Sequence, residues 1–288
     1  MSKKELAYII DPPPKHWVGN GFHVHTMFHP GHNLYKYTTP FLMMDFAAPK
    51  KFAPTKAKRG VGEHPHRGFE TVTFAFGGEV EHRDSSGGGG VIGKGDVQWM
   101  TAASGVVHEE FHSQKFSEEG GVFEMVQLWV NLPSEYKMTS PRYQGVKGET
   151  FPRIHHAQGV ELKLVSGNYL GEVGPCKTFS PINLIQTDME EGSNFSLSLE
   201  DKTNLLVLVR KGSVSLNGNE VNEHQLAIFH RDGQEVEVSS KVGAELLIMN
   251  AVPIDEPVFS HGPFVMSTKE EIIQAFEDYQ SGKMGHLS

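Results

Sequence analysis

The sequence predicts an all-β fold of two β-barrels in tandem, with one helix near the C-terminus. Short apolar runs of strand length, rich in β-branched and aromatic residues, recur between Gly, Asn and Asp residues. The chain of 288 residues includes 31 Gly and 16 Pro, which indicates many turns. A weak repeat relates residues 70–108 to residues 205–238, and two copies of one β unit indicate two barrels.

The predicted strands follow one another at close, regular spacing, which favours a sandwich or barrel over alternating strands and helices. They are residues 71–76, 123–130, 162–165, 205–209, 214–216, 225–229, 235–238 and 245–249. The stretch 136–160 is polar, contains prolines and shows little strand pattern. We therefore predict a first barrel in residues 1–135, a linker in 136–160 and a second barrel in 161–288.

One helical pattern lies at the end of the predicted second barrel. Ser267 and Glu270 have the spacing of a capping box, and Gly282 is placed to end the helix. The predicted apolar face consists of Ile272, Ile273, Phe276 and Tyr279. We expect this helix to close one face of a β domain.

Charge and composition argue against several classes of protein. The formal net charge is -9 and the pI about 6.0, so the surface repels phosphate backbones and no direct nucleic-acid partner is expected. The basic stretch 50–59 is interpreted as a solvated loop. A single cysteine, Cys176, allows no intramolecular disulfide, and no apolar run approaches the ~20 residues that span a bilayer. Without a recognisable secretory signal, the expectation is a cytoplasmic protein that does not bind membranes.

Two pairs of residues have the spacing of metal ligands. On a strand, His64 and His66 point to one face, and so do His108 and Glu110. Two such pairs on neighbouring strands would direct four ligands towards one point inside a barrel.

The alternative is that these pairs occur by chance, because the chain has 16 His. His23 and His25 form another pair of this spacing, for which no second pair is evident. The remaining histidines singled out are interpreted as surface or hydrogen-bonded structural residues: His82, His112, His155, His156, His224, His230, His261 and His286.

The flanking residues favour the metal site. The order His64, His66, Glu70 and Gly77, followed by Gly95, Gly105 and His108, resembles the two signatures of cupins, which are jelly-roll-like β-barrels. In the second signature, Ala103 stands in place of the proline and His112 in place of the asparagine.

The chain resembles the pirin family more closely. The motifs that carry the resemblance are residues 40–45 (PFLMMD), 64–71 (HPHRGFET), 95–102 (GDVQWMTA), 128–132 (LWVNL) and 261–268 (HGPFVMST), in pirin order. Pirins are bicupins, so the resemblance implies two tandem cupin barrels. It also implies one iron in the first barrel, held by His64, His66, His108 and Glu110. Glu70, a ligand in cupins generally, is not a ligand in pirins.

The ligand chemistry agrees with this assignment. Three imidazoles and one carboxylate, without cysteine, suit a divalent transition metal with open coordination positions, and Fe(II) is the predicted ion; Mn, Ni, Cu or Zn also fit such a site. The second barrel has no equivalent pair, since His224 and His230 are six residues apart without a carboxylate pair. We therefore expect no metal in the second barrel and no other cofactor.

Two functions from different classes follow. The first is a dioxygenase resembling quercetin 2,3-dioxygenase, with a flavonol-like aromatic substrate, O2 and Glu110 as the general base. Residues such as Phe74, Phe76, Met100 and Met125 would line its cavity; the alternative is that they are ordinary barrel core. The small residues Gly87–Gly90 would leave the mouth of the barrel open; the alternative is that they form the tip of a hairpin. The alternative is a non-enzymatic, redox-dependent regulator that binds a protein partner. Residues 23–28 (HVHTMF) differ from the arginine-rich segment of animal pirins, which favours the enzyme or an unknown bacterial-type role. We expect a monomer.

Overall fold

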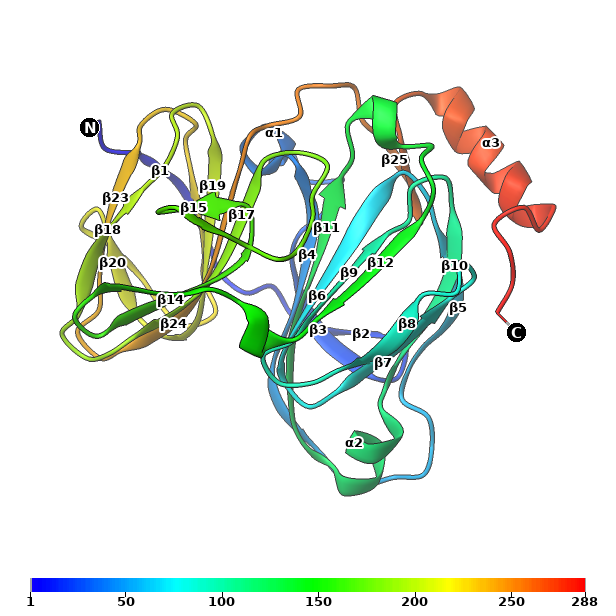
Figure 1. Ribbon diagram of the computed structural model, residues 1–288, viewed down its shortest axis with the longest axis horizontal. Coiled ribbons are helices and arrows are strands. Elements are labelled where there is room, and N and C mark those ends of the chain that lie inside the picture. The colour runs from blue at the N-terminus through cyan, green and yellow to red at the C-terminus, as the bar shows by residue number, and fades with distance from the viewer. Residues whose placement is uncertain (1, 288) are drawn as a thin grey trace. The chain divides into compact units, whose positions relative to one another are not determined.

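The computed structural model describes residues 2–287 and is built mainly of strands (Figure 1). The chain divides into two compact units, each a two-sheet β-barrel with its own core. The first barrel comprises residues 14–31, 41–149 and 254–287, and the second barrel comprises residues 2–13, 32–40 and 150–253. The predicted all-β fold with two barrels and a C-terminal helix is confirmed.

The first barrel is built from a seven-stranded and a four-stranded antiparallel sheet. The larger sheet has the order β12 (Arg142–Val146), β9 (Val97–Thr101), β6 (Phe69–Gly77), β11 (Gly121–Asn131), β4 (Phe41–Phe52), β3 (Phe22–Phe28) and β2 (His16–Val18). The smaller sheet has the order β5 (Gly60–His66), β10 (Val106–His112), β7 (Val80–Asp84) and β8 (Gly89–Ile92). The hairpin β25 (Phe259–His261) and β26 (Phe264–Met266), the helix α2 (Gln114–Glu119) and the 3-10 turns Ser134–Tyr136 and Gly148–Thr150 complete it.

The second barrel repeats this strand order. Its larger sheet runs β1 (Leu6–Ile10), β22 (Leu226–Phe229), β19 (Asn204–Gly212), β24 (Ala244–Ala251), β17 (Ile182–Met189), β14 (Val160–Ser166) and β13 (Arg153–Ala157). Its smaller sheet runs β18 (Asn194–Ser198), β23 (Glu235–Ser239), β20 (Val214–Leu216) and β21 (Asn219–Val221). The hairpin β15 (Asn168–Tyr169) and β16 (Glu172–Val173) and the helix α1 (Tyr35–Thr38) are added. The repeat seen in the sequence therefore corresponds to strands β6–β10 and β19–β23.

The chain ends and the predicted linker differ from the simple division made from the sequence. Residues 2–13 join the second barrel, because β1 pairs with β22, and residues 254–287 join the first. The predicted linker contains the strands β12 and β13, and the boundary between the units falls inside it, after Glu149. Both strands are edge strands that are largely half-exposed or exposed, which explains why they show no apolar pattern.

Helix α3 (Lys269–Gln280) begins one residue later than predicted. Its capping box consists of Thr268 and Glu271: the Glu271 backbone N–H donates to Thr268 Oγ1 at 3.1 Å, and the Thr268 N–H donates to Glu271 Oε2 at 2.9 Å. The predicted pair Ser267 and Glu270 is therefore wrong by one position.

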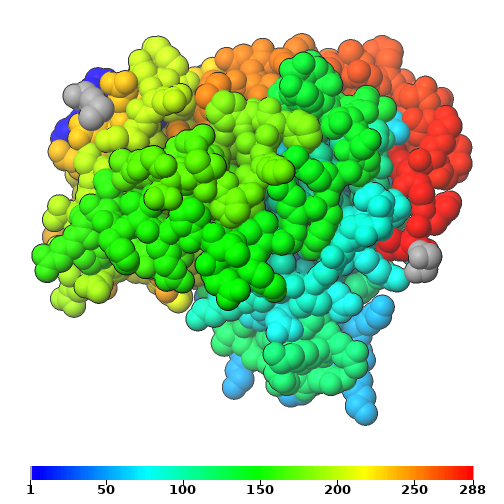
Figure 2. All heavy atoms as spheres, viewed as in Figure 1, coloured from blue at the N-terminus to red at the C-terminus, as the bar shows by residue number. Residues whose placement is uncertain are grey.

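The buried face of α3 is also narrower than predicted. Ile272 and Ala275 are buried, whereas Ile273 and Tyr279 are exposed. Together with Met284, the buried residues pack against Phe264 and Met266 of the C-terminal hairpin and Val107 of β10. The helix thus belongs with the first barrel and not with the second; Figure 2 shows this C-terminal segment, in red, on the molecular surface.

A buried ion pair attaches α3 to the first barrel. Arg67 Nη1 lies 2.9 Å from Asp278 Oδ2, and Arg67 Nε donates to the Ser104 carbonyl at 2.7 Å. Arg67 directly follows the candidate ligand His66, so the helix is tied to the strand end that carries this histidine. Among residues 2–287, no helix has the length and apolarity needed to cross a membrane.

Replacing Asp278 by Ala is expected to lower the free energy of unfolding by about 3 kcal/mol, because the Arg67 guanidinium would stay buried without a counter-ion. The matched control is Lys283→Ala, since the Lys283 ammonium contacts the same carboxylate at 2.7 Å from an exposed position. That change should cost less than about 1 kcal/mol. Urea unfolding of both variants measures the difference, and equal losses would contradict a buried anchor.

Candidate metal centre

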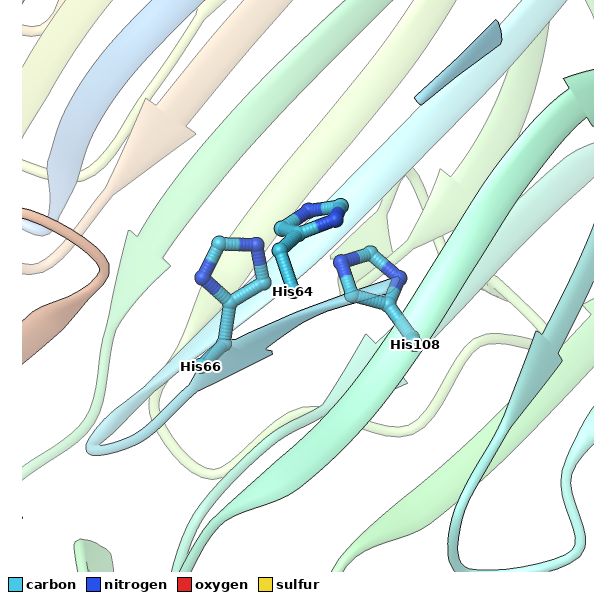
Figure 3. Close-up of side chains that lie close together, drawn as sticks. All are labelled: His64, His66 and His108. Carbon is cyan, nitrogen blue, oxygen red and sulfur yellow. The ribbon is translucent and has the colours of Figure 1, made fainter. Parts of the chain in front are cut away.

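The pairing of β5 with β10 brings three histidines together. His64 and His108 are partners in the antiparallel register, and His66 lies on the same face as His64, two residues along β5. Figure 3 shows the three rings converging on one point. The ring centroids of His64 and His108 are 4.2 Å apart, and those of His66 and His108 are 4.8 Å apart. One nitrogen from each ring lies within 4.8 Å of the others, so this group can hold a metal ion.

Hydrogen bonds leave the Nε2 atoms of two of these rings free to bind a metal. His64 Nδ1 lies 2.8 Å from the Gly62 carbonyl oxygen, and His66 Nδ1 lies 3.3 Å from that of Pro263. A carbonyl only accepts hydrogen bonds, so each Nδ1 carries the proton and each Nε2 keeps its lone pair.

The third ring carries an unsatisfied buried atom. His108 is fully buried, and its Nε2 makes no hydrogen bond to any group within residues 2–287. A buried polar nitrogen without a partner costs roughly 1–3 kcal/mol, and coordination of a cation would remove that cost. The donor set therefore fits a metal.

Burial also keeps the ligand nitrogens unprotonated. Loss of solvation, and then repulsion from neighbouring histidines, holds the pKa of His66 and that of His108 well below 6.5. Neutral imidazoles are the form that binds metals, so this environment favours ligation at neutral pH.

Glu110 lies beside this group and not within it. Its carboxylate belongs to an overlapping group with His82 and His108. Gln98 Nε2 donates to Oε1 and Gln127 Nε2 donates to Oε2, both at 2.8 Å. Ligand carboxylates are commonly held by such donors. The assignment of Glu110 as fourth ligand and as general base stays a prediction.

His82 is the residue of the site that the sequence did not single out as functional. It is buried on β7, beside β10, and its Nδ1 lies 3.4 Å from His108 Nδ1. Its Nε2 lies 3.2 Å from Asp84 Oδ2. Burial alone would raise the pKa of Asp84, but hydrogen bonds from His82, Ser86 and Gly88 lower it to about 2.

These contacts form a chain from Asp84 to the metal site. The ionised Asp84 accepts the Nε2–H of His82, so His82 Nδ1 accepts the Nδ1–H of His108, and the lone pair of His108 Nε2 is left for a metal. The i, i+2 spacing of His82 and Asp84 was the available signal, because it matches that of the pair His64 and His66.

The other histidine pair stands apart from both groups. His23 stacks on Trp17 with ring centroids 4.6 Å apart, and neither His23 nor His25 belongs to a metal-compatible group in residues 2–287. His112 is a structural residue: it is buried among phenylalanines and its Nε2 lies 3.0 Å from the Gly21 carbonyl oxygen.

Glu70 points away from the site. Phe69 packs its ring against His66, and the alternation of β6 therefore directs Glu70 to the opposite face of the sheet. There it is buried and accepts a hydrogen bond from Thr101 Oγ1 at 2.6 Å. The carboxylate that would be a ligand in cupins generally is thus separated from the three histidines by the sheet itself.

A cavity of about 340 Å³ opens beside the histidines. His64, His66 and Glu110 line it together with four further polar residues and seven apolar ones. The polar residues are His16, Thr26, Asp45 and Gln127, and the apolar ones are Val18, Phe22, Val24, Met43, Val61, Met125 and Trp129. Of the suggested lining residues only Met125 is present. Phe74, Phe76 and Met100 are buried elsewhere, and Gly87–Gly90 lie outside the lining.

Comparison with known proteins places the chain in a class and then in a family. Both barrels define a protein with two cupin domains: the Pirin family model matches residues 21–130 and the Pirin C-terminal cupin domain matches residues 184–285. The chain belongs to the pirin family.

Individual relatives cover nearly the whole chain. A Pseudomonas aeruginosa protein named "Putative quercetin 2,3-dioxygenase PA2418" is 46% identical over 281 residues, which is 97% of this chain and 98% of that protein. A pirin-like protein of Caulobacter vibrioides is 37% identical over 250 residues, or 85% and 87% of the two chains. A crystal structure of quercetin 2,3-dioxygenase from Acinetobacter baumannii aligns with a TM-score of 0.96 and 44% identity, covering 100% of both chains.

Replacing His82 by Phe is expected to lower metal affinity about 10- to 100-fold, because His108 would lose the acceptor that orients its ring. His112→Phe is the matched control, since His112 is a buried histidine of the same barrel outside the site. Competition with a chromophoric chelator measures both affinities. Equal metal affinities of the two variants would contradict the role of the chain of contacts from Asp84 through His82 to His108.

The Glu70→Gln variant should keep its metal, whereas His66→Ala should lose most of it. It should also change the pH dependence of stability, because burial raises the pKa of Glu70 from 4.5 to about 7. A raised folded-state pKa adds stability that is complete below pH 4.5 and is lost as the pH rises through 7. Between pH 5 and 8 the wild type should therefore lose more stability than Glu70→Gln, as measured by urea midpoints and metal content. Parallel pH profiles would refute this assignment.

Proposed function

We propose that this pirin is a quercetin 2,3-dioxygenase-type oxidoreductase that holds one divalent transition metal, iron(II), through His64, His66, His108 and Glu110. The observation that carries the proposal is the group of three histidines with a buried, unpaired His108 Nε2, next to a cavity that His64 and His66 line. The names of the Pseudomonas and Acinetobacter relatives support the choice of reaction.

The cavity suits a planar aromatic ligand. Its volume of about 340 Å³ lies in the range of small-molecule sites, and half of its lining residues are apolar. Trp129 and Phe22 offer aromatic surface, and Met43 and Met125 offer adaptable thioether side chains. These walls would hold a flavonol by dispersion and exclude water from its rings.

Glu110 is the candidate general base for the flavonol 3-hydroxyl. The amides of Gln98 and Gln127 each donate to one of its oxygens, and its side chain lines the same cavity. A carboxylate in that position accepts the phenolic proton and leaves the 3-hydroxylate beside the histidines. When bound, the metal supplies Lewis acidity and one-electron chemistry for O2.

The test uses protein loaded with iron under anaerobic conditions. We expect about one metal per chain, a shift of the flavonol absorption band on adding quercetin, and loss of that band with carbon monoxide release when O2 is admitted. His66→Ala, which removes one ligand, is expected to lose the shift and the turnover.

Two results would contradict the proposal. A metal content near two per chain would mean a further site, with His23 and His25 the first residues to inspect. No absorption shift at saturating quercetin together with no O2-dependent turnover would leave the metal-dependent regulatory role, with a protein partner, as the better account.

A further inference from the structure

A row of polar side chains crosses the larger sheet of the first barrel on the face that points to the histidines. Its members are register partners on five adjacent strands: Thr26 of β3, Asp45 of β4, Gln127 of β11, Thr73 of β6 and Gln98 of β9. Cross-strand partners direct their side chains to the same face of a sheet. Both glutamines of this polar row hold Glu110.

Asp45 is the carboxylate of the polar row, and the candidate metal site does not use it. It lines the cavity together with Thr26 and Gln127, but it belongs to no metal-compatible group within residues 2–287. It lies on β4 opposite Gln127 of β11, and Gln127 donates a hydrogen bond to Glu110. The aromatic and thioether walls of the cavity surround both positions.

The Asp45 carboxyl group is almost fully buried, and Thr26 is its hydrogen-bond donor within residues 2–287. Its side chain is 7% exposed, and Thr26 Oγ1 donates to its Oδ1. In residues 2–287 no lysine, arginine or histidine side chain forms an ion pair with it. Burial raises the pKa of Asp45, whereas the hydrogen bond from Thr26 and the nearby His16, which lines the same cavity, act in the opposite direction.

Such a group is expensive in a barrel interior unless something in the cavity binds it. A carboxylate accepts hydrogen bonds strongly from phenolic O–H groups, and bonds to charged acceptors are about twice as strong as neutral ones. The cavity therefore has apolar walls, the histidines and Glu110 for one hydroxyl, and a further acceptor for a second hydroxyl.

We propose that Asp45, positioned by Thr26, is the specificity residue of the cavity and accepts a hydrogen bond from a second phenolic hydroxyl of the ligand. The substrate class is then aromatic compounds with a hydroxyl for the metal site and at least one more hydroxyl elsewhere on the ring system. This inference rests on the proposed function for its aromatic ligand, and it adds the selection between flavonols.

The experiment compares quercetin with 3-hydroxyflavone, which keeps the 3-hydroxyl and lacks the others. Dissociation constants for both are measured by absorbance titration of metal-loaded protein without O2. The wild type should bind quercetin more tightly, and Asp45→Asn should reduce the ratio of the two constants about tenfold, because the hydrogen bond to the second hydroxyl is then no longer charge-assisted. Thr26→Val should reduce the ratio by less.

The matched control is Met43→Leu, a conservative change at another lining position of the same strand. It should weaken both flavonols alike and leave the ratio unchanged. Metal content and urea midpoints establish that each variant is folded, and a merely structural role for Asp45 would not move the ratio.

The outcomes separate this inference from the proposed function. An Asp45→Asn ratio equal to that of the wild type overturns the role of Asp45 even where quercetin is turned over. A ratio that falls in Asp45→Asn supports it even where no O2-dependent reaction occurs, in which case the dioxygenase proposal alone fails. Failure of the wild type to bind either flavonol overturns both.

Discussion

The antiparallel register of β5 and β10 is the constraint on which the candidate metal centre depends. It sets His64 opposite His108 and places His66 on the same face. A slip of β5 by one residue would turn His64 and His66 to the other side of the sheet and separate them from His108 on β10. Several interactions hold this register: Val106 and Val107 are buried beside His108, the Pro263 carbonyl meets His66, and Arg67 is tied to Asp278. The C-terminal segment thus contributes to the site although none of its side chains is a candidate ligand.

The opposite sheet determines what surrounds the histidines. Buried polar groups are tolerated when they satisfy one another, and the two glutamines of the polar row do so through Glu110. Two buried groups beside the cavity are relevant to ligands: His108 Nε2 has no hydrogen-bond partner within residues 2–287, and the Asp45 carboxyl group accepts a hydrogen bond from Thr26. Each has a ligand chemistry that would satisfy it: a metal for the first and a hydroxyl for the second.

Sequence periodicity predicted many of the strands and the helix, but not which strands pair with one another. Alternation along a strand predicted that His64 and His66 share one face, as do His108 and Glu110, because each pair lies within one strand. The chain Asp84–His82–His108 and the polar row depend on register between strands far apart in the sequence, as from Thr26 to Gln98, and no local pattern encodes that register. The helix start was ambiguous for a different reason: Ser267 and Thr268 are adjacent capping residues, and Glu270 and Glu271 complete a box with either spacing. Its docking site depended on Arg67 and Asp278, which are 211 residues apart.

The second barrel shows why one strand order supports two different interiors. Across the strands equivalent to those of the polar row, the register partners are Leu164, Ile185, Ile248, Val207 and Ala227, all buried in one apolar core. Where the first barrel pairs β5 with β10 through histidines, the second pairs Phe195 with Val238 and Leu197 with Val236. An apolar core of this kind is stabilised by close packing of its side chains and needs no ligand. The first barrel instead has polar groups on both facing sheets. The backbone hydrogen bonds common to the two barrels maintain the fold while the side chains differ.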